Sequence, residues 1–225
     1  TSVTAVLAGE SSIVLGNVVG SNIANILLVF GLTAFVAADQ LKVGTSILKL
    51  DIPVLLIASA GLYYAVSDGD FSTIEGVTGL VLLAIYLFRS ISQDAGNEER
   101  TLVAGKTYLI FLLAGVFVFL GSKYTIVGIE GISTIAGISP DLIALSMVAL
   151  GTSLPEVVVS LQAAKRGKAE IALGNVIGSN IFNILAVMGL SRFAGSLSIS
   201  DTILGFSLPF MMAVTVLLAL LCVRA

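Results

Sequence analysis

The chain contains no histidine and no tryptophan, and Cys222 is its single cysteine. One cysteine cannot form an internal disulfide, and without histidine the chain lacks the nitrogen and sulfur ligand sets that hold zinc or copper. Only 11% of the 225 residues are charged, and no basic patch with interleaved aromatic residues points to nucleic acid. We therefore expect no redox chemistry, no transition metal, no cofactor and no nucleic-acid partner.

Apolar residues are correspondingly abundant. They make up 57% of the chain, and the mean hydropathy of +1.09 lies well above that of soluble domains. Several runs reach the roughly 20 apolar residues that a helix needs to cross about 30 Å of hydrocarbon. The composition predicts an all-α integral membrane protein embedded in a lipid bilayer.

The apolar runs predict the tail of one helix at 1–8 and seven nearly complete spans. The predicted spans are 11–37, 46–66, 72–90, 101–122, 131–165, 169–191 and 201–223. We expect Pro140 and Pro155 to interrupt the fifth span, because a proline inside a helix removes a hydrogen bond. The polar stretch at 89–100 is the candidate linker between two halves.

A duplicated segment supports this division. Residues 13–32 (IVLGNVVGSNIANILLVFGL) and 171–190 (IALGNVIGSNIFNILAVMGL) are identical at 15 of 20 positions, at an offset of 158. Five predicted crossings separate the starts of the two copies, and an odd number turns the second copy upside down in the membrane. Inverted repeats are typical of secondary transporters, with the site near the midplane where the repeats meet. The predicted organisation is the remainder of a first inverted repeat at 1–92, a cytoplasmic linker at 93–100 and a second inverted repeat at 101–225, which lacks its last helix.

The distribution of basic residues predicts an orientation. If the loop at 165–168 is cytoplasmic, alternation places nine of the eleven Lys and Arg residues on that side, and only Lys123 and Arg192 on the other. We therefore expect a multi-pass protein of the plasma membrane with loop 165–168 in the cytoplasm.

Glu156 is the one acidic residue that the predicted spans place deep in the membrane, and no Lys or Arg lies near it in sequence. An unpaired buried carboxylate is costly or takes up a proton, so Glu156 calls for a compensating cation. Pro155 frees the Gly151 carbonyl, and Thr152 and Ser153 add hydroxyl groups on the same turn. Carboxylate, hydroxyl and carbonyl oxygens are the ligands that hard cations such as Ca²⁺ and Na⁺ prefer. For Thr152, a hydrogen bond back to its own helix is an equal alternative.

Each copy of the duplicated segment carries a polar stripe of three residues spaced four apart, which should face the bundle interior. The two stripes are Asn17, Ser21 and Asn25 in the first copy and Asn175, Ser179 and Asn183 in the second. Ordinary interhelical hydrogen bonding explains such a stripe as well as ion coordination does. Gly16 with Gly20, and Gly174 with Gly178, are spaced to let a neighbouring helix approach closely.

These motifs carry a family resemblance. ALGTSLPE at 149–156, followed by GNVIGSNIFNIL at 174–185 and matched by GNVVGSNIANIL at 16–27, resembles the two α-repeats of the cation/Ca²⁺ exchanger superfamily. The prokaryotic Na⁺/Ca²⁺ exchanger type is the most similar, and the resemblance covers essentially the whole chain. It implies a ten-helix antiporter in which Na⁺ and Ca²⁺ bind alternately at one central site, with access switched by two helices sliding past the bundle.

The resemblance also implies roles for single residues. Glu156 would be one of two carboxylates that bridge the ions, and Thr152 and Ala149 would contribute backbone oxygens. The expected hydroxyl ligands are Ser153, Ser21 and Ser179. The residues expected to complete the midplane ring are Asn25 and Asn183.

The chain departs from the family pattern in two respects. Asn occupies both ring positions, where several exchangers, including K⁺-dependent ones, carry one Asp, and this argues against K⁺ coupling. The first copy of G-T-S-x-P-E would fall at −7 to −2, since Gly151 and Glu156 minus the offset of 158 give those positions. Completing both repeats would add about 57 residues before Thr1 and one helix after Ala225, which makes ten helices and roughly 300 residues.

The leading hypothesis is a secondary antiporter, not an enzyme, that exchanges Ca²⁺ for Na⁺. An H⁺/Ca²⁺ antiporter is the nearest alternative, because the same carboxylates can carry protons. A cation channel is the alternative from a different class, since a channel uses a similar oxygen-lined seam.

Overall fold

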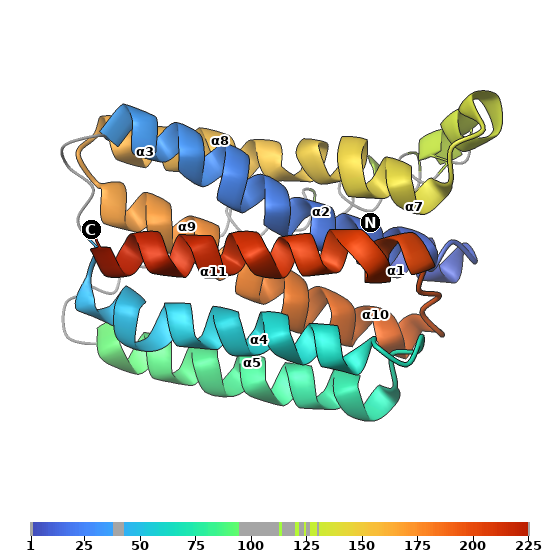
Figure 1. Cartoon of the computed structure of the whole chain (residues 1–225), viewed down its shortest axis with the longest axis horizontal. Coiled ribbons are helices and arrows are strands. Elements are labelled where there is room, and N and C mark those ends of the chain that lie inside the picture. The colour runs from blue at the N-terminus through green and yellow to red at the C-terminus, as the bar shows by residue number, and fades with distance from the viewer. Residues whose placement is uncertain are drawn as a thin grey trace.

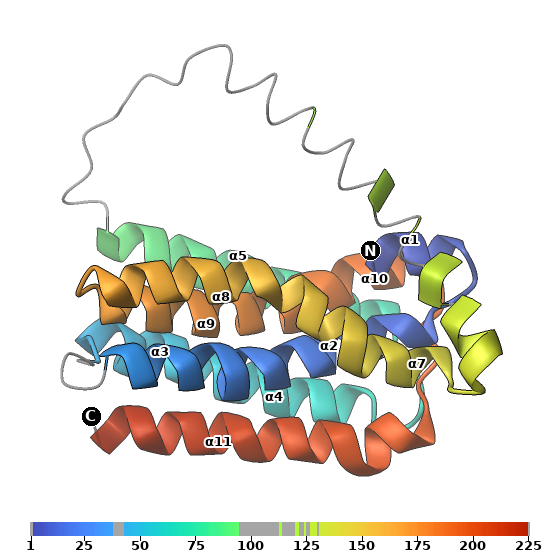
Figure 2. The same ribbon diagram turned by 90° about the horizontal axis from the view of Figure 1, so that it is seen from above.

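The computed structural model describes residues 2–37, 43–94 and 131–224, together with single residues and short pieces between 113 and 129. Regular structure in these parts is entirely helical, and the long helices lie side by side along one direction (Figures 1 and 2). Six of them are long and apolar enough to cross a membrane: Ser12–Ala37, Ile47–Ala65, Thr73–Ser92, Pro140–Lys165, Ala169–Ala194 and Ile203–Arg224.

These six helices confirm six of the seven predicted spans and the all-α membrane class. The remaining span, at 101–122, and nearly all of the predicted linker at 93–100 lie outside the described residues. The boundaries of the two repeats therefore stay predictions.

The first half of the chain builds three spans. A short helix, α1 (Ser2–Leu7), precedes the first span, in which α2 (Ser12–Ala24), the π-helical turn η1 (Asn25–Phe30) and α3 (Gly31–Ala37) are continuous. The second span joins η2 (Ile47–Asp51) to α4 (Ile52–Ala65), and the third is α5 (Thr73–Asp94).

The second half repeats this plan. One span joins α7 (Pro140–Ile143), the π-helical turn η3 (Ala144–Val148) and α8 (Ala149–Lys165). The next joins α9 (Ala169–Phe182), η4 (Asn183–Val187) and α10 (Met188–Ala194), and the last joins η5 (Ile203–Ser207) to α11 (Leu208–Arg224). The tight turn at 165–169, with Gly167 at φ +73°, brings α8 and α9 together as neighbours.

The predicted interruption at Pro155 is wrong, because Pro155 lies inside α8 and the helix continues to Lys165. The missing amide hydrogen costs one helical bond, and the bonds on either side hold the helix in a solvent that offers no replacement. The interruption near Pro140 is confirmed: Gly137 has φ +66°, Ser139 is extended, and the new helix begins at Pro140.

The two copies of the duplicated segment run in opposite directions. In Figure 1 the chain enters α2 from the end of the bundle near the N label and enters α9 from the opposite end. The predicted inverted repeat is therefore present. The span of α2 and α3 is the most enclosed of the six and α5 the least, so the duplicated segments form the core and α5 lies at the periphery.

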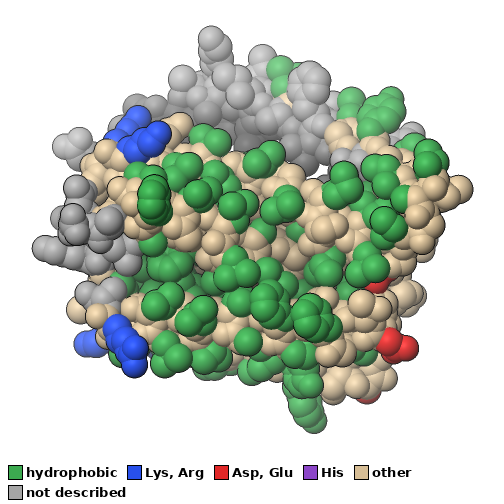
Figure 3. Space-filling view, turned by 45° about the horizontal axis from the view of Figure 1, so that its top comes forward, with side chains coloured by type: hydrophobic (Ala, Val, Ile, Leu, Met, Phe, Trp, Pro, Cys, Tyr) green, Lys and Arg blue, Asp and Glu red, His purple; other side chains and the backbone are tan. Residues whose placement is uncertain are grey.

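Basic side chains gather at one end of the bundle. Lys165, Arg166 and Lys168 are exposed there, whereas Asp68 and Asp70 are exposed in the turn at the other end. Figure 3 shows the same separation on the face in view, with Lys and Arg at one end and acidic side chains towards the other. The two ends of the membrane bundle thus differ in charge.

Candidate cation site between the repeats

A cavity of about 300 Å³ is lined by residues from several helices of the bundle. Its walls come from α1, from α2 and η1, from α8, and from η4 and α10, so both repeats contribute. The polar residues that line it are Ser2, Asn17, Ser21, Asn25, Thr152, Ser153, Glu156, Asn183 and Ser191.

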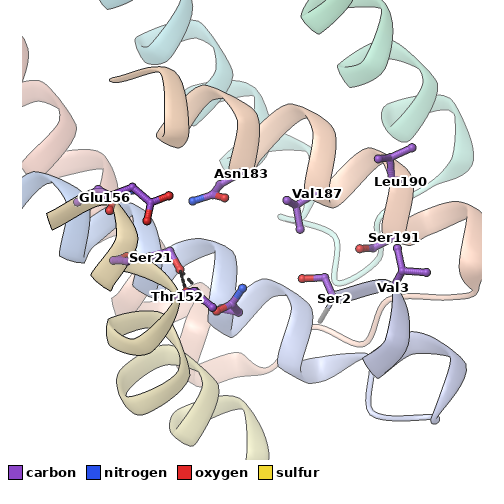
Figure 4. A pocket seen from close by; sticks show the side chains of 12 residues that line it. Ser2, Val3, Ser21, Thr152, Glu156, Asn183, Val187, Leu190 and Ser191 are labelled. Atoms are coloured by element: carbon purple, nitrogen blue, oxygen red, sulfur yellow. Dashed lines mark hydrogen bonds between the residues drawn. The ribbon is translucent and has the colours of Figure 1, made fainter. Parts of the chain in front are cut away.

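Six of the eight residues expected from the sequence line this cavity: Ser21, Asn25, Thr152, Ser153, Glu156 and Asn183. Glu156 and Asn183 extend into it from different helices, α8 and the α9–η4 span (Figure 4). Ala149 is fully buried and Ser179 is half-buried, and neither residue lines the cavity. The fold therefore brings residues 135 positions apart in the chain, Ser21 and Glu156, into one chamber.

Several oxygens in this cavity have no protein partner. Among the described residues, six buried side-chain atoms make no hydrogen bond, and four of these belong to residues that line the cavity. The four are Asn25 Oδ1, Ser153 Oγ, Glu156 Oε2 and Ser191 Oγ. Buried polar atoms are nearly always hydrogen-bonded, so four unpartnered oxygens that line one cavity indicate that the cavity holds water or an ion.

Thr152 and Ser21 connect α8 to α2. Their hydroxyl oxygens are 3.0 Å apart, and each also lies near Asn17 Oδ1, at 3.4 Å for Thr152 and 3.5 Å for Ser21. Thr152 Oγ1 is also placed to donate to the Ala149 carbonyl at 3.0 Å, so the alternative of a bond back to its own helix is present. A hydroxyl has one hydrogen, and donation to Ala149 leaves the Thr152 lone pairs for Ser21 or an ion.

The donor set contains oxygen only. Within the described residues no group of three or more His, Cys, Asp and Glu side chains lies close enough to hold a metal ion. One carboxylate, several hydroxyls and several amides instead surround the cavity, a set typical of sites for hard cations.

Comparison with known proteins agrees with this chemistry. Residues 1–92 and 106–224 match the family described as sodium/calcium exchanger protein. The chain belongs to that family. It is 34% identical to the putative antiporter CaxA of Alkalimonas amylolytica, over 99% of this chain and 73% of that protein. It is 30% identical to the sodium/calcium exchanger MaX1 of Methanosarcina acetivorans, over 96% and 75% respectively.

Solved structures give the same result. The fold matches the sodium-calcium exchanger NCX_Mj soaked with Na⁺ and Sr²⁺ with a TM-score of 0.71 and 31% identity, over 99% of this chain and 73% of that chain. The resemblance to the prokaryotic exchanger type is thereby confirmed. The chain is a multi-pass membrane protein of a family of cation/Ca²⁺ exchangers, which are transporters and not enzymes.

Two asparagines that the sequence pattern did not single out are hydrogen-bonded to the lining residues Asn25 and Asn183. Asn22 and Asn180 are related by the repeat offset of 158 and are 1% and 0% exposed. Each follows a stripe serine directly, so helical periodicity assigned it to another face. The sequence feature that pointed to them is the presence of an asparagine at this position in both copies of an otherwise apolar segment.

The wide π-helical turns begin at the ring asparagines in both repeats, η1 at Asn25 and η4 at Asn183. Such turns are rare and occur frequently at functional sites. Their positions follow the offset of 158, so the irregular backbone belongs to the duplicated unit.

The two glycine pairs differ in their surroundings. A Cβ at Gly20 would collide with the Leu145 carbonyl and lie 2.7 Å from the Ala149 Cβ, and one at Gly16 would meet the Asp141 carbonyl. The predicted close approach is therefore confirmed for α2 against the α7–α8 span. At Gly174 and Gly178 no described atom lies within 4 Å of the same position, so the prediction for the second pair stays open.

Proposed function

We propose that this exchanger couples Ca²⁺ transport to Na⁺ and that the cavity between the repeats is its transport site. The observation that carries the proposal is the group of buried, unpartnered oxygens in the cavity that Glu156 lines. A carboxylate at membrane depth without a protein cation beside it is stable only when protonated or when an ion binds.

The proposed ligands follow from the lining. Glu156 supplies the charge, Ser153 and Ser21 supply hydroxyl oxygens, and Asn25 and Asn183 supply amide oxygens. The backbone oxygens of Thr152 and Ala149 and the hydroxyl of Ser179 complete the proposed set by repeat symmetry and family resemblance. Ca²⁺ and Na⁺ are the transported ions in this proposal, and the protein needs no cofactor.

Charge balance explains why two ions would exchange at such a site. A desolvated divalent ion calls for about two negative charges, and the described lining supplies one, from Glu156. We propose that a repeat-related G-T-S-x-P-E segment supplies the second. Na⁺ ions would balance the charge of the same two carboxylates and would also bind the neutral hydroxyl and amide oxygens. Ca²⁺ and Na⁺ would therefore compete for the same pair of carboxylates.

Neutral oxygens also favour Na⁺ over H⁺ as the coupling ion. A proton needs one basic atom, and Glu156 is the one acidic or basic residue among those that line the cavity. The hydroxyls and amides around it have no role in binding a proton, whereas a Na⁺ ion needs several such ligands.

Ca²⁺ uptake into proteoliposomes under imposed gradients tests this function. The protein expressed from its complete gene is reconstituted, and an outward Na⁺, H⁺ or K⁺ gradient is applied in turn. We expect uptake with the Na⁺ gradient alone. Uptake driven by the H⁺ gradient without Na⁺ would assign H⁺ coupling, and uptake without any counter-gradient would indicate a channel.

We also propose a plasma-membrane location with the basic end of the bundle in the cytoplasm. Lys165, Arg166 and Lys168 are exposed at that end, and cytoplasmic loops carry an excess of Lys and Arg.

A further inference from the structure

Asn22 and Asn180 form an amide clasp across the two repeats. Asn22 Nδ2 donates to the Asn180 backbone oxygen at 3.5 Å, and Asn180 Nδ2 donates to the Asn22 backbone oxygen at 3.3 Å. The two bonds are equivalent under the offset of 158. The clasp therefore lies on the pseudo-twofold axis that relates α2 to α9.

The oxygen atoms of the clasp hold the ring asparagines. Asn25 Nδ2 donates to Asn180 Oδ1 at 2.9 Å, and Asn183 Nδ2 donates to Asn22 Oδ1 at 3.1 Å. These two bonds are also equivalent by the repeat, and each joins a ring residue of one repeat to a clasp residue of the other. Asn25, Asn22 and Asn180 are all at most 1% exposed, so water does not compete for these bonds.

An asparagine at a cation site must present the correct end of its amide. The oxygen and nitrogen ends have nearly the same shape, but only the oxygen accepts, and an NH₂ group facing the ion would repel it. In this structure the nitrogen of each ring asparagine is engaged by the clasp. Asn25 Oδ1 is correspondingly left buried and without a partner in the wall of the cavity.

We propose that Asn22 and Asn180 are positioning residues of the transport site: each fixes the amide of the opposite repeat's ring asparagine so that its oxygen faces the ion. This inference rests on the proposed function, because it concerns the same cavity. Neither clasp residue touches the ion; each acts through its ring partner, Asn22 through Asn183 and Asn180 through Asn25.

A purely structural clasp is the competing explanation. The bonds from the clasp Nδ2 atoms to backbone oxygens join α2 to α9 and stabilise the packing whatever the ring amides do. The two explanations differ in one respect. An aspartate at a ring position presents an oxygen in either orientation, so it needs no positioning partner, and loss of the clasp residue should then not weaken Ca²⁺ binding further. If the clasp only joins the two helices, loss of the clasp residue should weaken Ca²⁺ binding in the aspartate variant as well.

A crossed double-mutant cycle separates the two. Equilibrium binding of radiolabelled Ca²⁺ is measured on the purified protein from its complete gene, for Asn22→Ala and Asn180→Ala, each alone and combined with Asn183→Asp. Loss of one orienting hydrogen bond, worth about 0.5–1.5 kcal/mol, should weaken Ca²⁺ binding about 2- to 10-fold in each single variant.

The combinations decide the matter. We expect Asn22→Ala to have no further effect once residue 183 is aspartate, while Asn180→Ala keeps its full effect in that background because it acts on Asn25. The reverse pattern should hold with Asn25→Asp. Asn22→Leu, which fills the space of the amide without an acceptor, is measured in the same way, and thermal melting of every variant reports on folding.

The outcomes are distinguishable from those for the proposed function. The positioning role would be overturned if Asn22→Ala lowered Ca²⁺ affinity equally with asparagine or aspartate at position 183, or if neither single variant changed Ca²⁺ affinity. Either result would leave the proposed transport site in place. Failure of the unmodified protein to bind Ca²⁺ would overturn both.

Discussion

At the residue scale, the cavity depends on oxygens whose usual hydrogen bonds are missing. Glu156 Oε2 and Ser153 Oγ are buried in the cavity without a partner. On the same turn of α8, Pro155 removes the amide hydrogen that would otherwise bond to the carbonyl of Gly151, a residue outside the cavity lining. A protein under selection for stability alone would provide hydrogen-bond partners for these oxygens, since an unsatisfied buried polar group costs about 1–3 kcal/mol of stability. The presence of unpartnered oxygens in the cavity that Glu156 lines is the residue-level argument for ion binding.

Pro155→Ala restores the amide hydrogen and allows the Gly151 carbonyl to return to the helix. We expect the variant to melt no lower than the unmodified protein but to transport Ca²⁺ about 2- to 10-fold more slowly, the effect of about one hydrogen bond on the turn that carries the lining residues Thr152, Ser153 and Glu156. Reconstituted Ca²⁺ flux and thermal melting measure the two quantities. Pro209→Ala, in the outer helix α11, is the control and should leave flux unchanged. Unchanged flux in Pro155→Ala would show that the freed carbonyl has no part in transport.

Ser21→Ala removes a hydroxyl that lines the cavity and lies 3.0 Å from Thr152 Oγ1. A neutral hydroxyl contributes relatively more to a monovalent ion, so the Na⁺ concentration that half-saturates exchange should rise about 2- to 10-fold. Exchange rates measured across a range of Na⁺ concentrations test this, with the exposed Ser92→Ala in α5 as control. A change confined to Ca²⁺ affinity would contradict the assignment.

Sequence reasoning identified the cavity residues because lipid makes polar side chains conspicuous. Glu156 and the duplicated stripes were expected to lie together, and Ser21, Asn25 and Asn183 do line one cavity with Glu156. The orientation of single amides was beyond this reasoning, since it depends on contacts between residues 158 and 161 positions apart. Asn22 and Asn180 were missed for that reason.

At the scale of elements, α2 is the helix on which the site is assembled. Ser21 and Asn25 face the cavity from this span, and Gly16 and Gly20 let the α7–α8 span approach the same helix closely. Small residues allow this close contact, which fixes the distance from Ser21 on α2 to Thr152 on α8. The packing of one helix pair thus controls the geometry of the ligand set.

Gly20→Ala tests this packing. The added methyl group would meet the Leu145 carbonyl and the Ala149 side chain, and overpacking of this kind costs about 1–3 kcal/mol. We expect a melting temperature several degrees lower in detergent, together with weaker Ca²⁺ binding. Gly61→Ala on α4, where no described atom lies within 4 Å, should melt like the unmodified protein. Equal melting temperatures for the two variants would mean that the close contact is not required.

Helix positions were predictable and helix irregularities were not. Because length and hydropathy decide which segments cross a bilayer, the apolar runs located the ends of the six described spans to within three residues, except that the span predicted from 131 begins at Pro140. Pro155 was expected to interrupt its helix and does not, and the π-helical turns at Asn25 and Asn183 had no sequence signal beyond the duplication itself. Tertiary contacts decide such details.

At the scale of the whole molecule, the inverted repeat gives two similar half-sites that meet at the clasp of Asn22 and Asn180. Repeat symmetry lets a protein expose one central site to either side in turn, because each half can take the arrangement of the other. The cavity reaches Ser2 of α1 and Ser191 of α10, and these two helices lie at the end of the bundle where α4 ends (Figure 1).

The predicted orientation can be measured by labelling single cysteines. In a Cys222→Ser background, Asp68→Cys and Arg166→Cys place one thiol at each exposed end of the bundle. A membrane-impermeant maleimide should label Asp68→Cys in intact cells and Arg166→Cys only after permeabilisation. The opposite pattern would invert the proposed topology.

The most direct test of the account is Ca²⁺ flux through Glu156→Gln. Glutamine keeps the size of the side chain and removes the charge that offsets the desolvation of a bound ion, which is worth about 3–5 kcal/mol for a buried pair. Ca²⁺ flux by the reconstituted protein should therefore fall more than about 100-fold while the variant still folds. Glu170→Gln, exposed in the first turn of α9, should retain full flux. Flux in Glu156→Gln equal to that of the unmodified protein would contradict the central claim that this cavity is the transport site.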